Sequence, residues 1–112
     1  MRILSLEGLP GRPVDAHGSK GLTVGAFGLT ADAHLVAVRL RPGGVIARHP
    51  AAGAQLLAVL VGDAVVSGAD GDPVAIGPGQ AAVWDPYEPH ETRSETGLTA
   101  LVVEGDLDVA SS

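Results

Sequence analysis

Short apolar segments separated by glycine or proline recur along the whole chain, about every eight to twelve residues. No stretch keeps the i, i+3, i+4, i+7 spacing of an amphipathic helix for more than about two turns. Turn sequences such as Pro42-Gly43-Gly44 and Asp70-Gly71 stand between the segments and supply residues that adopt a positive or preset φ. This rhythm predicts an all-β protein.

The expected strands lie at residues 2–6, 22–29, 34–41, 45–49, 55–61, 64–67, 73–76, 80–84, 90–94 and 99–104. The chain has 112 residues, of which 46% are hydrophobic, enough for one core. We therefore expect a single domain over residues 1–112. It would consist of an N-terminal strand segment at 1–19, a core at about 20–105 and a short tail at 106–112.

The segment QLLAVLV, residues 55–61, is apolar on both faces of the expected strand. Its alternate residues are Leu57, Val59 and Val61 on one face, and Leu56, Ala58 and Leu60 on the other. Two apolar faces indicate burial on both sides. The outer face then needs cover from the N-terminal segment or from a second subunit, and we expect a homodimer.

Charge and cysteine content exclude several classes of protein. The net charge is −6, and residues 63–112 carry ten acidic and one basic side chain, a balance that disfavours nucleic acid as a partner. Cysteine is absent, so a metal would need histidine, carboxylate, amide or water ligands. The longest apolar run, 56–61, is far shorter than the roughly 20 residues of a membrane span. We expect a cytoplasmic protein with no membrane partner.

The stretch PGGVIARHPAAGAQLLAVLVGDAVV, residues 42–66, resembles the first motif of the cupin superfamily, Gly-x5-His-x-His-x3-Glu-x6-Gly. Gly43 and Gly62 open and close the motif, and His49 takes the position of the first histidine. Ala51 takes the position of the second histidine, and Gln55 takes that of the glutamate. The spacing of the motif is kept throughout.

The stretch GQAAVWDPYEPHETRS, residues 79–94, resembles the second cupin motif, Gly-x5-Pro-x-Gly-x2-His-x3-Asn. Gly79 and His90 match it, whereas Asp85, Tyr87 and Ser94 replace its proline, second glycine and asparagine. The two motifs occur in order and at full spacing. The resemblance implies the double-stranded β-helix of cupins, an all-β jelly-roll barrel.

In metal-bearing cupins, three histidines and a glutamate hold one transition metal ion, and this sequence matches two of those four positions. Ala51 has no donor atom, and Gln55 offers only a neutral carbonyl oxygen. The resemblance thus implies a degraded metal site and no resident cofactor. One alternative stays open: a divalent transition metal bound by His49 and His90 with Gln55 or Glu88, in an enzyme of the dioxygenase or isomerase type.

The expected pocket of the barrel is lined by His49, Gln55, His90, Trp84 and Tyr87, and we expect it to bind a small organic molecule. The rings of Trp84 and Tyr87 either stack on the ligand or take a rim or core role. Whether it also catalyses a reaction is open. In another interpretation, the two histidines are satisfied by hydrogen bonds inside a pocket that no longer functions, and the protein is structural or regulatory.

Other polar residues match no motif position. His17 and His34 are expected to be ordinary surface or strand residues. Arg39, Arg41 and Arg48 lie close to the first motif in sequence. They either bind a carboxylate or phosphate, or serve solubility and ion pairing at the surface.

Overall fold

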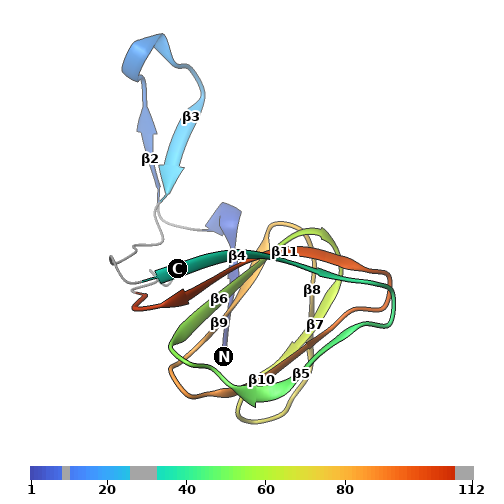
Figure 1. Ribbon diagram of the computed structural model, residues 1–112. Coiled ribbons are helices and arrows are strands. Elements are labelled where there is room, and N and C mark those ends of the chain that lie inside the picture. Colours follow the sequence, from blue (N-terminus) through green and yellow to red (C-terminus); the bar gives the residue numbers. More distant parts are fainter. Residues whose placement is uncertain (9–10, 26–32, 108–112) are drawn as a thin grey trace.

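The computed structural model describes residues 1–8, 11–25 and 33–107 (Figure 1). Their strands are β1 (Arg2–Ser5), β2 (Gly11–Val14), β3 (Leu22–Gly25), β4 (Ala33–Leu40), β5 (Val45–Pro50), β6 (Ala54–Gly62), β7 (Ala64–Ser67), β8 (Val74–Ile76), β9 (Gln80–Trp84), β10 (Pro89–Arg93) and β11 (Leu98–Gly105). Two single-turn 3₁₀ helices, η1 (Leu6–Gly8) and η2 (Ala16–Gly18), complete the elements. None of the helices in these ranges is long and apolar enough to span a membrane.

Two antiparallel sheets face each other. One has five strands in the order β1-β9-β6-β11-β4, and the other has four in the order β5-β10-β7-β8. Figure 1 shows β4 and β11 along the top of the sandwich, and β5 and β10 along its bottom. The prediction of an all-β protein is confirmed. One expected strand, 22–29, is described only as far as Gly25, and residues 26–29 of it lie outside the described ranges, as do residues 108–112 of the expected tail.

The main core fills the space between the two sheets. The five-stranded sheet contributes Leu57, Val59, Ala82, Trp84, Ala100 and Val102, and the other sheet contributes Ala64, Val66 and Ile76. Alternate residues of each strand point inward, so the period of two in the sequence builds this core directly.

A smaller apolar cluster covers part of the outer face of the five-stranded sheet. It consists of Leu4, Leu56, Ala81 and Val83, with Leu107 packed against it. Strand β1 brings Leu4 there because Leu4 pairs with Ala81. The N-terminal segment therefore covers one end of the outer face, which is one of the two alternatives that the apolar 55–61 segment left open.

The other end of this strand departs from the predicted pattern. The pairing of β6 with β11 shifts between Thr99↔Val61 and Ala100↔Val59, so Leu60 is an extra residue in β6. The alternation therefore changes after Val59, and Leu60 and Val61 are 46% and 64% exposed. A single chain therefore does not bury both faces over the whole segment, and cover for these two residues would have to come from the second subunit that we expect.

The β2–β3 hairpin stands clear of the two sheets (Figure 1). Its pairing runs from Gly11↔Gly25 to Val14↔Leu22. Strand β2 was not predicted, because Gly11 and Pro13 are residues that strands disfavour.

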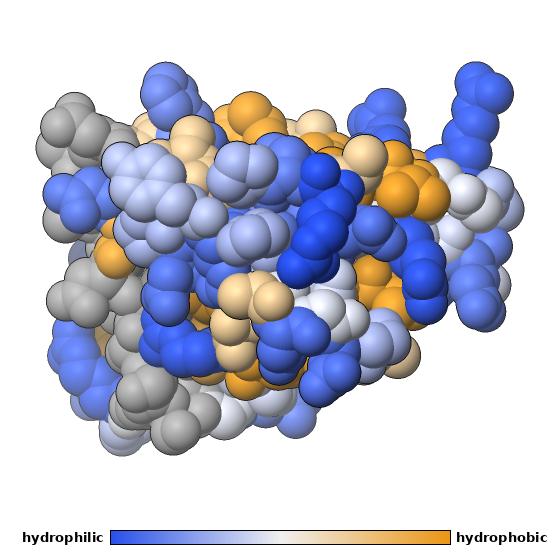
Figure 2. Space-filling model, turned by 90° about the horizontal axis from the view of Figure 1, so that it is seen from below, coloured by the Kyte–Doolittle hydropathy of each residue, from blue (hydrophilic) through white to orange (hydrophobic). Residues whose placement is uncertain are grey.

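Figure 2, which views the molecule from below, shows hydrophilic residues interspersed with hydrophobic ones on that face.

Candidate functional site

A cavity of about 270 Å³ opens between the two sheets, on the side of β4. Its apolar wall is made by Val36, Val38, Ile46, Leu57 and Val102. Its polar residues are His34, His49, Gln55, His90, Thr92 and Glu104. Three residues predicted for the pocket, His49, Gln55 and His90, thus come together around one cavity.

The two histidines form a pair on neighbouring strands. His49 in β5 lies opposite His90 in β10, and their ring centroids are 4.5 Å apart. Nδ1 of His49 lies 2.7 Å from the carbonyl oxygen of Ala47, and Nδ1 of His90 lies 3.1 Å from that of Glu88. A carbonyl oxygen only accepts, so each Nδ1–H donates, and in the neutral ring Nε2 is left as an acceptor.

His90 is only 2% exposed, and its ring packs against the indole of Trp84 at a centroid distance of 4.7 Å. Burial lowers the pKa of His90, and the neighbouring His49 adds to this effect. The hydrogen bond to Glu88 and the charges of Glu104 and Glu88 partly oppose it. His90 is therefore a neutral imidazole at neutral pH.

A row of polar residues on the five-stranded sheet lines the cavity opposite the histidine pair. Glu104 in β11 pairs with His34 of β4 on one side and with Gln55 of β6 on the other. Nε2 of Gln55 donates to Oε2 of Glu104 at 2.5 Å. The residue at the glutamate position of the motif thus donates a hydrogen bond to a carboxylate on the adjacent strand.

Glu104 and His34 were missed by the motif comparison. A signal for Glu104 is present in the sequence, because Leu98, Ala100 and Val102 are the inward residues of β11 and Glu104 continues their alternation. The expectation for His34, an ordinary strand residue, did not place it beside a cavity. Its place there follows from its pairing with Glu104 across two strands, which spacing along the chain does not reveal.

Trp84 and Tyr87 were predicted to line the pocket, and neither is among the residues that line it. Trp84 is fully buried in the main core, where Nε1 donates to the carbonyl oxygen of Ser67 at 3.1 Å. It supports His90 from behind. Tyr87 has a positive φ of 65° in the turn before β10 and is 76% exposed.

Glu88 holds the turn before β10 in place. Its carboxylate accepts from the backbone N–H groups of Ala69 at 2.9 Å and Asp85 at 3.0 Å, and from the amino group of Met1 at 2.9 Å. Burial acts to raise its pKa, but the hydrogen bonds from Ala69, Met1 and Asp85 outweigh it, and the pKa is lowered. Glu88 does not line the cavity.

The residues around the cavity do not fit a transition metal site. In residues 1–8, 11–25 and 33–107, no three histidine, cysteine, aspartate or glutamate side chains are grouped closely enough to hold a metal ion. The alternative set with Glu88 is not assembled, because that carboxylate is bonded to Met1, Ala69 and Asp85. The amide nitrogen of Gln55 is bonded to Glu104, so Gln55 offers only its neutral carbonyl oxygen.

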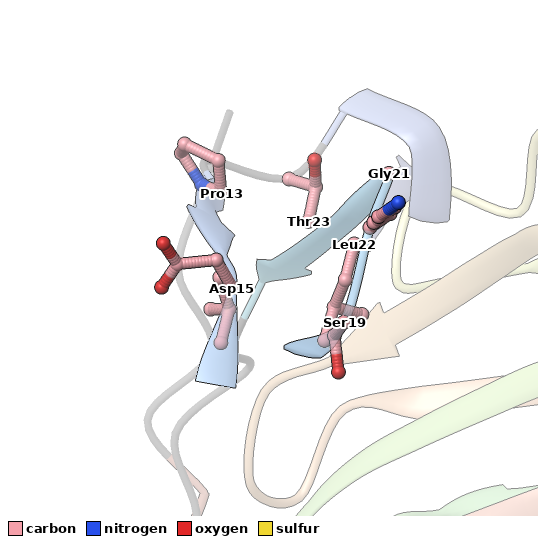
Figure 3. A pocket seen from close by; sticks show the side chains of 8 residues that line it. Pro13, Asp15, Ser19, Gly21, Leu22 and Thr23 are labelled. Carbon is pink, nitrogen blue, oxygen red and sulfur yellow. The ribbon is translucent and has the colours of Figure 1, made fainter. Parts of the chain in front are cut away.

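Other hollows among the described residues include two that lie outside this cavity. The first, about 610 Å³, is lined only by residues 13–23 of the β2–β3 hairpin, including Asp15 and Leu22 (Figure 3). The second lies beside Arg48, which donates to the carbonyl oxygen of Gly68 at 2.7 Å. Neither hollow contains a histidine, and Arg39, Arg41 and Arg48 do not line the cavity between the sheets.

Comparison with known proteins agrees with this architecture. A family model described as "Cupin domain" matches residues 36–109. A cupin family protein with a double-stranded β-helix fold from Methanocaldococcus jannaschii is 16% identical, with a TM-score of 0.59. The match covers 65% of this chain and 69% of that one, and at this identity it shows the fold.

Two other solved structures have different activities. The DMSP lyase DddQ from Ruegeria pomeroyi is 26% identical, with a TM-score of 0.61, over 70% of this chain and 41% of that one. A sugar phosphate isomerase of the cupin superfamily from Silicibacter pomeroyi is 21% identical, with a TM-score of 0.59, over 68% of this chain and 52% of that one. No curated protein matches the sequence.

Proposed function

The chain belongs to the cupin domain family, and from the chemistry of its cavity we propose that it binds a small organic molecule between its two sheets. The observation that carries this proposal is the composition of the cavity. Five aliphatic side chains form its wall, and the polar groups of His49, His90, Gln55 and Glu104 converge on the same space. Sites for small molecules combine an apolar lining with a few placed polar groups in this way.

The hydrogen bonding of His90 favours a working binding site over a pocket that no longer functions. A pocket without a ligand gains nothing from an imidazole nitrogen kept open to it in an otherwise buried ring. Within the described residues, Nδ1 of His90 is hydrogen-bonded, whereas Nε2 has no hydrogen-bond partner. Every fully buried side-chain nitrogen in these residues has a partner, so Nε2 of His90 is not fully buried. Nε2 is therefore open to the cavity that His90 borders, where a ligand can reach it.

The activities of the structural relatives do not transfer to this chain. A lyase and an isomerase share the fold, and a fold alone does not determine which chemistry its site performs. The proposal is accordingly limited to binding by this chain's own cavity residues.

A cavity-filling substitution tests the proposal. Val36 and Leu35 are neighbours on β4, but Val36 lines the cavity, whereas Leu35 is 66% exposed and does not line it. In Val36→Trp the indole occupies the cavity, and in Leu35→Trp it lies outside. Thermal-shift screening of a broad metabolite set should find compounds that stabilise the wild type and Leu35→Trp but not Val36→Trp. Equal stabilisation of both variants, or no compound that stabilises the wild type, would contradict the proposal.

A further inference from the structure

The proposed ligand can be narrowed to a chemical class, an inference that rests on the proposed function. We propose that the cavity selects a small organic amine, in which a cationic hydrogen-bond donor is attached to an apolar body. The hydrogen-bonding capacity, the charge and the shape of the cavity each support this class.

Most of the open polar groups of the cavity are acceptors, and the exceptions are His34 and Thr92, which can donate as well as accept. In the neutral form of each ring, Nε2 of His90 and Nε2 of His49 accept, since both Nδ1 atoms donate to main-chain carbonyls. Gln55 uses Nε2 on Glu104, so its Oε1 is left as an acceptor. Glu104 accepts through both carboxylate oxygens. A ligand that satisfies these atoms must bring several N–H or O–H donors.

The charge of the cavity points to a cation. No lysine or arginine is among the lining residues. Among the described residues, Glu104 forms no ion pair, and its hydrogen bond comes from the uncharged amide of Gln55. A half-buried carboxylate without a balancing charge is costly, and it is stabilised when a cation binds beside it. The same carboxylate repels an anionic ligand.

The shape and lining of the cavity limit the rest of the ligand. Its volume of about 270 Å³ equals that of about nine water molecules in the liquid. Val36, Val38, Ile46, Leu57 and Val102 offer no hydrogen bond, so the part of the ligand that faces them is apolar. An amine on a single ring or a short branched chain satisfies both requirements.

Three probes that share one ring test the class: benzylamine, benzyl alcohol and benzoate. Their dissociation constants are measured by calorimetry or NMR at about pH 8, where histidines with ordinary pKa values are neutral. We expect benzylamine to bind at least about tenfold more tightly than benzyl alcohol, and benzoate to bind most weakly.

Glu104→Gln removes the charge but keeps an oxygen that accepts from Gln55. It should weaken benzylamine binding about tenfold and leave benzyl alcohol unchanged. Glu91→Gln is the matched control: it makes the same charge change on β10 at a residue outside the cavity, and it should alter neither. A wild-type preference for benzoate, an equal amine preference in Glu104→Gln, or no binding of any probe below about 10 mM would overturn this inference. The proposed function fails separately, through the comparison of Val36→Trp with Leu35→Trp.

Discussion

Restoring the acid of the first motif, by Gln55→Glu, should destabilise this protein. In the structure Nε2 of Gln55 donates to Oε2 of Glu104. A carboxylate at position 55 loses that donor and places a second negative charge against Glu104. The motif alone suggests the opposite, because glutamate is the residue that the cupin motif contains there.

The expected loss of stability has two parts. A hydrogen bond to a charged group contributes about 1.5–3 kcal/mol. Two unit charges about 4 Å apart repel by about 4 kcal/mol at an effective dielectric constant of about 20, but solvent and local rearrangement reduce this at a half-buried residue. We therefore expect a loss of about 2–4 kcal/mol in the free energy of unfolding at about pH 8.

The loss should depend on pH with a definite sign. Two carboxyls in contact share a proton well above the pH at which a single glutamate ionises. That proton replaces the amide N–H as the donor, so the difference between Gln55→Glu and the wild type should shrink as the pH falls from about 8 to about 5.

Urea unfolding at both pH values, in the presence of a chelator, measures the difference. Gln80→Glu is the control, because Oε1 of Gln80 accepts from the N–H of Gly77 and a carboxylate keeps that bond. It should change stability little. If Gln55→Glu is as stable as the wild type at about pH 8, or if its deficit does not shrink on acidification, the assignment of Gln55 as the donor to Glu104 is wrong.

The lowered pKa of His90 means that its contribution to stability is complete above the unfolded pKa of about 6.5 and is lost as the pH falls below it. Stability should therefore decline with acidification more in the wild type than in His90→Gln, and parallel curves would contradict this. Gly62→Ala should cost more than about 2 kcal/mol, because Gly62 has a φ of +91° and an added Cβ would clash with the carbonyl oxygen of Gly97. Gly43→Ala, with a φ of +79° and open space around it, should cost less in the same denaturation assay. Elemental analysis of protein purified without a metal-affinity step should find well under one transition metal per chain, and chelator should leave the melting temperature unchanged; one metal per chain that disappears in His49→Ala would contradict this. Light scattering at micromolar concentration should find a dimer that Val61→Glu dissociates, whereas a monomeric wild type would refute the dimer.

The sequence predicted best those features of the fold and the site that depend on residues close together along the chain. Strand alternation and turn residues predicted the all-β fold. The spacing of the two motifs predicted a shared pocket for His49 and His90, which lie opposite each other on adjacent strands. The sequence predicted less well the features that depend on how strands distant in the chain pair with each other. The shift at Thr99 turned Val61 outward, and the register of β11 placed Glu104 beside Gln55. No local pattern encodes either event.

The position of the carboxylate explains why this cavity differs from a metal site despite a similar set of groups. A cupin motif with glutamate at position 55 and the present cavity both have one carboxylate near two histidines. Here, however, the carboxylate is on β11, and its contact is the amide of Gln55, while the histidine pair lies on the opposite sheet with Ala51 in place of a third imidazole. A metal ion needs its ligands within about 2–2.5 Å of one point. An organic ammonium ion carries its charge and its N–H donors at one end and its apolar body at the other, so it can contact Glu104 through the ammonium group and the apolar wall through the rest of the molecule.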